Sequence, residues 1–89
     1  MTATIAKLIK EGAIIIDVRS PAEFAKGANP KSVNIPLDVF ASRLVELHAS
    51  KTYVLCCASG GRSGMAEGQM KSKGFKKVFN AGPWKNTIV

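Results

Sequence analysis

The chain has few cysteines and almost no histidine. Its 89 residues include two cysteines, Cys56 and Cys57, and one histidine, His48. Adjacent cysteines are no disulfide framework, because a bridge between neighbouring residues strains both the disulfide and the peptide between them. Two cysteines and one histidine without ligand-like spacing also argue against a metal site. We therefore expect no bound metal and a reducing compartment.

Long hydrophobic runs are missing as well. The first apolar pattern, over residues 5–10, is interrupted by lysine, and no later run approaches the length that spans a bilayer. Internal repeats and low-complexity linkers are absent too. Because 46% of the residues are hydrophobic, the composition indicates a globular fold. We expect one domain over residues 1–89, located in the cytoplasm, with no membrane partner.

Acidic residues are scarce relative to basic ones. Six Asp and Glu face thirteen Lys and Arg, which gives a formal net charge of +7. The densest basic segment, residues 71–77, contains four lysines with Phe75 as its one aromatic residue, and no nucleic-acid-binding motif accompanies it. We interpret this segment as a solvated face and expect no nucleic-acid partner. A positive field of this kind attracts small anions.

The hydrophobic pattern alternates between strands and helices. Short β-rich runs predict strands over 13–18, 32–35, 53–56 and 77–79, and helical spacing predicts helices over 5–10, from 21, from 37 and over 63–73. Gly12 is placed to end the first helix, and Ser20 to cap the second with help from Glu23. This order predicts an α/β fold with a small central parallel sheet and helices on both faces. In such sheets the ligand site lies beyond the carboxyl ends of the strands.

Residues 53–67 carry the clearest functional signal in the chain, because a predicted buried strand with both cysteines at its end leads into a glycine-rich loop. Ser59, Gly60 and Gly61 permit a tight backbone path, and the N–H groups of such a loop favour negative charge at one point. A thiolate is the nucleophilic form of cysteine, and neighbouring N–H groups and cations lower its pKa. We therefore predict Cys57 as a nucleophile. Cys56, which continues the strand, is expected in the core.

Four segments in this order resemble a rhodanese-like domain, that is, a single-domain thiosulfate sulfurtransferase. They are Ile-Asp-Val-Arg-Ser-Pro-Ala-Glu-Phe at 16–24, Val-Asn-Ile-Pro-Leu at 33–37, Cys-Ala-Ser-Gly-Gly-Arg-Ser at 57–63, and Asn-Ala-Gly at 80–82 before Trp84. The resemblance extends from about Ile5 to Trp84. The usual Gly-His-Ile-Pro-Gly-Ala is replaced at 27–32, which removes a mainly structural histidine, and the N-terminal strand common in the family is missing.

The resemblance implies a function for the loop. Cys57 would carry a persulfide, and the residues that follow would bind the substrate: Ala58, Ser59, Gly60, Gly61, Arg62 and Ser63. Asp17, Arg19 and Glu23 would be structural residues near the site, with Arg19 paired to Glu23. The expected donor is thiosulfate or a similar small anion, the expected acceptor is cyanide, a thiol or a protein, and no cofactor is needed. Arg62 would either steer the donor or brace the loop.

Two other functions fit parts of the sequence. Counted from Cys56, the loop reads Cys-x5-Arg-Ser, the spacing of low-molecular-weight cysteine phosphatases and arsenate reductases. In that family the loop follows the first strand, whereas here more than half of the chain precedes it, and no general-acid loop follows. A non-catalytic rhodanese-like interaction module is the second alternative, disfavoured by the presence of Cys57 and Arg62.

Overall fold

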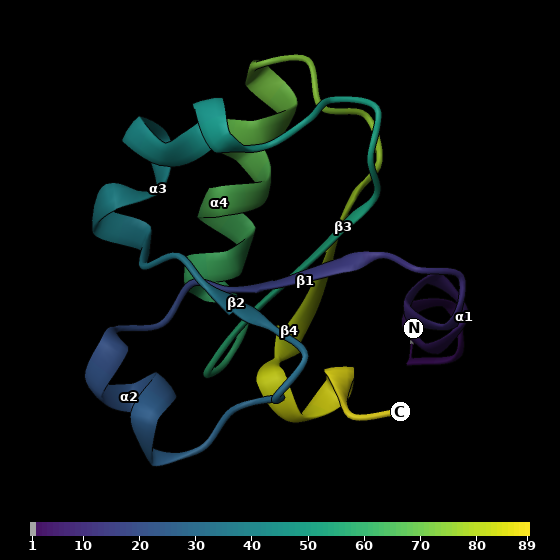
Figure 1. Ribbon diagram of the computed structural model, residues 1–89, viewed down its shortest axis with the longest axis vertical. Coiled ribbons are helices and arrows are strands. Elements are labelled where there is room, and N and C mark those ends of the chain that lie inside the picture. The colour runs from purple at the N-terminus through teal and green to yellow at the C-terminus, as the bar shows by residue number, and fades with distance from the viewer. Residues whose placement is uncertain (1) are drawn as a thin grey trace.

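A four-stranded parallel sheet forms the centre of the computed structural model, which describes residues 2–89 (Figure 1). The strands lie in the order β2-β1-β3-β4. Their bounds are β1 (Ile14–Asp17), β2 (Val33–Asn34), β3 (Tyr53–Cys57) and β4 (Val78–Pro83). The helices are α1 (Thr2–Lys10), α2 (Pro21–Lys26), α3 (Leu37–Arg43) and α4 (Gly61–Ser72), with two 3-10 helices, η1 (Leu44–Glu46) and η2 (Trp84–Thr87). The predicted α/β class with a central parallel sheet is confirmed.

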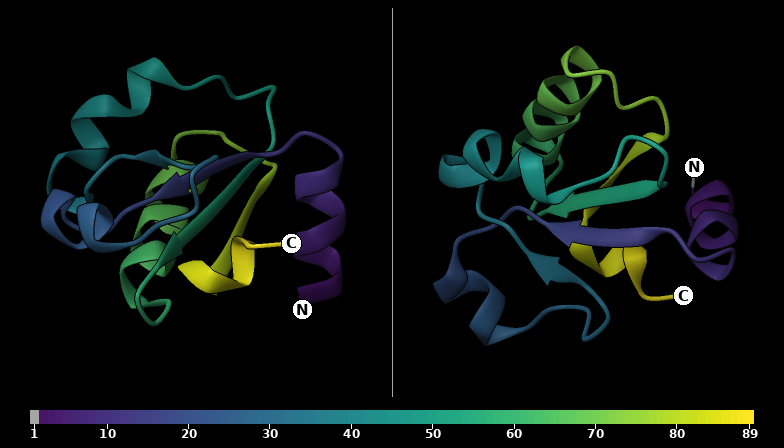
Figure 2. Two further views of the ribbon diagram at one scale, coloured as in Figure 1. Left: turned by 60° about the horizontal axis from the view of Figure 1, so that its bottom comes forward. Right: turned by 45° about the horizontal axis from the view of Figure 1, so that its top comes forward.

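Helices cover both faces of the sheet. α3 and α4 pack on one face, and α1 lies on the other with η2 (Figure 2). Every residue of β3 is buried. Because side chains alternate along a strand, Leu55 and Cys57 join the core under α3 and α4, while Val54 and Cys56 join the core under α1. The two adjacent cysteines therefore belong to opposite faces of the sheet.

Local signals at the first two helices act as the sequence predicts. After α1, Gly12 has φ +100, and the N–H of Gly12 donates to Ile9 while that of Ala13 donates to Leu8, the paired bonds of a Schellman motif. At α2, the Ser20 hydroxyl accepts from the Glu23 N–H and the Glu23 carboxylate accepts from the Ser20 N–H. This capping box fixes α2 directly after β1.

Several element boundaries differ from the prediction by one or more residues, and the two differences at α4 and β4 bear on the site. α4 begins at Gly61 rather than Ser63, because the loop turns at Gly60 with φ +108 and the next residue is already helical. β4 continues to Pro83 beyond the predicted 77–79, with an irregular register opposite Leu55 and Cys56. Glycine and proline disfavour strands, so no pattern in the sequence predicted the extension. The longer β4 brings Asn80 beneath the loop.

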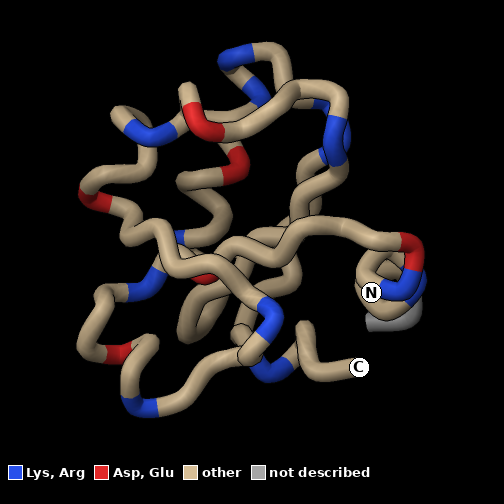
Figure 3. The backbone as a smooth tube through the Cα atoms, in the orientation of Figure 1, with Lys and Arg blue, Asp and Glu red and all other residues tan. Residues whose placement is uncertain are grey.

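Basic residues are distributed around the molecule (Figure 3). The lysines of the 71–77 segment are exposed, whereas Phe75 is buried in the core against Tyr53. The aromatic residue thus packs in the interior, which agrees with a solvated charged face. Among residues 2–89, no helix is long and apolar enough to cross a membrane.

Candidate active site

The site lies where β1 and β3 end. Asp17, the last residue of β1, is the register partner of Cys56, and β3 ends one residue later at Cys57. The chain then turns through an exposed Ala58 and Ser59 into Gly60 and the first turn of α4. This position beyond the carboxyl ends of parallel strands is the one expected for a ligand site.

Two donors converge on the sulfur of Cys57. The Gly60 N–H donates to Sγ at 2.9 Å, and the Ser63 hydroxyl lies 3.3 Å from Sγ. The left-handed conformation of Gly60 turns its N–H back toward the sulfur, and a side chain there would be strained and would meet the Gly82 Cα at 3.4 Å. The loop therefore requires glycine at this position.

These contacts change the acidity of Cys57. Burial raises the pKa of the thiol, but the hydrogen bonds from the Ser63 hydroxyl and the Gly60 N–H, together with the nearby N–H groups of Ser63 and Ser59, outweigh burial and lower the pKa to about 7. Although the residue is only 1% exposed, its sulfur faces the loop that leads to solvent. A pKa of about 7 leaves part of the thiol ionised at neutral pH, and the thiolate is the nucleophilic form of cysteine.

Cys56 has the opposite environment. It is fully buried between Ile15, Val54 and Ala81, and burial, followed by the charge of Asp17, raises its pKa to about 12. A cysteine with these properties is a core residue, as predicted. The phosphatase spacing starts from Cys56, so that interpretation has no available nucleophile.

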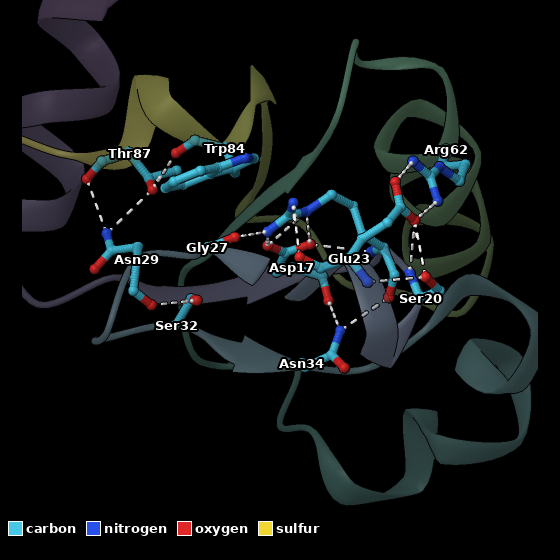
Figure 4. A network of polar contacts seen from close by, with 11 residues as sticks. Asp17, Ser20, Glu23, Gly27, Asn29, Ser32, Asn34, Arg62, Trp84 and Thr87 are labelled. Carbon is cyan, nitrogen blue, oxygen red and sulfur yellow. Dashed lines mark hydrogen bonds and ion pairs between the residues drawn. The ribbon is translucent and has the colours of Figure 1, made fainter. Parts of the chain in front are cut away.

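Arg62 pairs with Glu23 across 39 positions of the sequence (Figure 4). Nη1 donates to Oε1 at 2.6 Å and Nη2 to Oε2 at 2.9 Å, a bidentate geometry. The Arg62 bonds, then the Ser20 N–H, lower the pKa of Glu23 to about 2. Because Glu23 also caps α2, the pair ties the active-site loop to that helix. The arrangement favours a bracing role for Arg62.

The predicted pair between Arg19 and Glu23 is wrong. Arg19 Nη2 instead donates to the Asp17 carboxylate at 2.7 Å and to the Gly27 carbonyl at 2.7 Å. Of Glu23, only the backbone carbonyl comes near Arg19, at 3.5 Å from Nη1. The guanidinium also lies 5.0 Å from the ring centroid of Trp84. The i, i+4 spacing of Arg19 and Glu23 allows a pair at the start of a helix, but Asp17, two residues before Arg19, holds the guanidinium instead. Asp17 and Arg19 form a buried ion pair next to the site.

A pocket of about 350 Å³ adjoins the loop at Arg62. Its walls are mainly apolar and come from the ends of β1 and the starts of α2 and α3: Val18, Ser20, Pro21, Pro36, Leu37 and Asp38. Apolar walls with a few polar groups are typical of small-molecule sites. Among the described residues, no cluster of histidine, cysteine and carboxylate groups suits a metal ion.

Asn80 lies beneath the loop, although its sequence context predicts no role for it. Its side chain contacts Ser63, Gly60 and the Gly82 N–H. The only sequence signal was its place in a short Asn-Ala-Gly segment, which says nothing about a partner 17 residues earlier.

Comparisons with known proteins agree with this geometry. The family model described as "Rhodanese-like domain" matches residues 1–82. The chain is 44% identical over 69 residues to the Bacillus subtilis protein named "Putative sulfur carrier protein YrkF", covering 78% of this chain and 37% of that protein. It is 31% identical over 70 residues to a protein of Allochromatium vinosum named "Sulfurtransferase", covering 79% and 65%. The chain therefore spans less than two thirds of either relative.

The fold is shared with solved structures. A rhodanese-related protein from Thermoplasma volcanium superposes with a TM-score of 0.83 at 28% identity, over 98% of this chain and 86% of that one. Both the arrangement of the elements and the family model lead to one assignment. The chain belongs to the rhodanese-like domain family.

Proposed function

We propose that this chain is a sulfurtransferase that carries sulfane sulfur as a persulfide on Cys57. The observation that supports this most strongly is the pair of donors on Sγ, the Gly60 N–H at 2.9 Å and the Ser63 hydroxyl at 3.3 Å. They stabilise the anionic form of Sγ, which is both the attacking thiolate of the first half-reaction and the leaving group of the second.

The first half-reaction takes sulfur from a small anionic donor such as thiosulfate. The Cys57 thiolate attacks the outer sulfur of the donor, a new S–S bond forms, and the S–S bond of thiosulfate breaks. Sulfite leaves with the electron pair, and Cys57 is left as a persulfide anion. No external oxidant, metal or cofactor enters this balance.

The second half-reaction returns the enzyme to its starting state. An acceptor nucleophile attacks the outer sulfur of the persulfide and the Cys57 thiolate departs. The acceptor would be cyanide in an assay and a thiol or a protein in the cell. The apolar pocket beside Arg62 is open to an acceptor of this kind.

We assign donor binding to the backbone of the loop, residues 58–63. The Arg62 guanidinium is engaged by the Glu23 carboxylate, so its charge is largely compensated. Arg62 then acts by holding the loop in place, and the positive surface supplies the attraction for the anion. The names of the two relatives, a sulfur carrier and a sulfurtransferase, support sulfur transfer as the chemistry. A free thiolate of this kind also suits the cytoplasm, where thiols stay reduced.

The test is to replace each cysteine by serine. We expect Cys57→Ser to abolish transfer of sulfur from thiosulfate to cyanide. Cys56→Ser is the matched control and should keep most of the activity, because the Cys56 side chain faces the other core. Equal loss in two folded variants, or loss in Cys56→Ser alone, would contradict the proposal.

A further inference from the structure

Asn80 contacts both residues that donate to the Cys57 sulfur. Its Oδ1 accepts from the Ser63 hydroxyl at 2.7 Å and from the Gly82 N–H at 2.8 Å, and its Nδ2 donates to the Gly60 carbonyl at 3.1 Å. Only one orientation of the amide satisfies these partners, because a carbonyl faces Nδ2 and an N–H faces Oδ1. β4 thus fixes the loop from below.

The Ser63 hydroxyl has three acceptors and one proton. Its Oγ lies 2.7 Å from Asn80 Oδ1, 3.2 Å from the Gly60 carbonyl and 3.3 Å from Cys57 Sγ. Ser63 is 0% exposed, so solvent does not reach it directly. A hydroxyl donates one proton, so the three acceptors compete for it.

The charge on Cys57 decides this competition. When Cys57 is a thiol, the amide oxygen at 2.7 Å is the best acceptor, and the thiol can donate to Ser63 Oγ. When Cys57 is a thiolate, the charged sulfur becomes the stronger acceptor. Asn80 Oδ1 keeps its bond from the Gly82 N–H after the proton turns away, so no buried acceptor is left without a partner.

We propose that the Ser63 hydroxyl turns its proton from Asn80 to the Cys57 sulfur when Cys57 ionises, and that Asn80 is the positioning residue that holds this hydroxyl. The change is a rotation about the Cβ–Oγ bond of Ser63. No covalent bond of Ser63 breaks, and the proton of the thiol itself leaves to solvent. The proposal rests on the proposed function only in taking Cys57 as the nucleophile.

Other charges also act on Cys57 and must be kept constant in a test. The charged and titratable groups on the surrounding elements are Arg62 of α4, Glu23 of α2, which pairs with Arg62, Cys56 of β3, Asp17 of β1 with Arg19 after it, and Asp38 of α3, which lines the pocket beside Arg62. None of them contacts the Ser63 hydroxyl or the Asn80 amide in the described structure. These groups are the same in all variants at Ser63 and Asn80, so their contributions to the pKa of Cys57 cancel when the variants are compared.

The experiment is a double-mutant cycle read by the pKa of Cys57. In a Cys56→Ser background, reaction of Cys57 with methyl methanethiosulfonate is followed against pH for the parent, Ser63→Ala, Asn80→Leu and the double variant. Ser63→Ala should raise the pKa in both backgrounds. In the Asn80→Leu background the rise should be larger by about 0.5 or more, because the closest competing acceptor, at 2.7 Å, is gone and only the Gly60 carbonyl at 3.2 Å remains.

Asn80→Asp should change the effect of Ser63→Ala in the opposite direction, and it replaces Asn80→Leu in the experiment if Asn80→Leu does not fold. A carboxylate holds the Ser63 proton more strongly than an amide does, so the effect of Ser63→Ala should shrink in that background. An effect of Ser63→Ala that is equal in all folded backgrounds would overturn the proposal. Because the readout is thiol reactivity, a failure of sulfur transfer from thiosulfate would leave this result unaffected and would count against the proposed function alone.

Discussion

The ionisation of Cys57 is the property from which its chemistry follows, and it can be measured directly. In the Cys56→Ser variant, the rate of modification by methyl methanethiosulfonate should follow a single ionisation with a midpoint near the pKa of about 7 given by the loop. The reagent is small and neutral, so its access to the 1% exposed residue does not depend on surface charge.

The size of the effect decides which quantity to measure. At pH 7 a free cysteine of pKa about 8.5 is ionised to roughly 3%, whereas a pKa of about 7 gives about half, a gain of about fifteen-fold. A less basic thiolate is also a weaker nucleophile, and a Brønsted coefficient of about 0.45 removes roughly five-fold of that gain. The net acceleration of about three-fold could be hidden by restricted access, so the midpoint is the better measure.

The complementary variant provides the control. In Cys57→Ser the remaining thiol, Cys56, has a pKa raised to about 12 by burial and by Asp17, and it should stay unmodified below pH 9 in the folded protein. A midpoint above 8.5 for Cys57 in a folded Cys56→Ser variant would refute the stabilisation of the thiolate by the loop.

Two further predictions test the loop and its brace. Gly60→Ala should slow modification of Cys57 and destabilise the fold by about 1–2 kcal/mol, because φ +108 is strained for alanine. Gly61→Ala is the control and should do neither, because position 61 is helical and a Cβ added there meets no other atom. Similar effects of the two substitutions would be inconsistent with the geometry of the loop. Glu23→Gln keeps a capping side chain but removes the ion pair with Arg62. Arg62 and the Ser20 N–H lower the pKa of Glu23 to about 2, so the melting temperature of the parent should exceed that of Glu23→Gln above about pH 4.5. The difference in melting temperature should vanish as the pH falls through about 2. A difference that persists at the lowest pH would argue against the ion pair as its source.

Much of the fold could be predicted because its signals are local. Gly12 ends α1, Ser20 and Glu23 cap α2, and β-branched residues mark β1, each within a few positions of the element concerned. Alternation along β3 also separates Cys56 from Cys57, which assigns one cysteine to each face.

The partners of the site residues could not be predicted in the same way. Glu23 and Arg62 are 39 positions apart, and Asn80 meets a loop that begins 23 residues earlier at Cys57. Such pairs depend on the register of parallel strands and on where α4 begins. The family resemblance implied a pair between Arg19 and Glu23, whereas Arg19 forms its ion pair with the buried carboxylate of Asp17.

The central claim, a persulfide on Cys57, can be tested by mass measurement of the whole chain. After incubation with thiosulfate and removal of excess donor, the account predicts one added sulfur atom per chain, found in the peptide that contains Cys57 and released by cyanide or by a reducing thiol. The Cys57→Ser variant should gain nothing. A folded chain with a reactive Cys57 that acquires no sulfur from thiosulfate or from another sulfane donor would contradict the account.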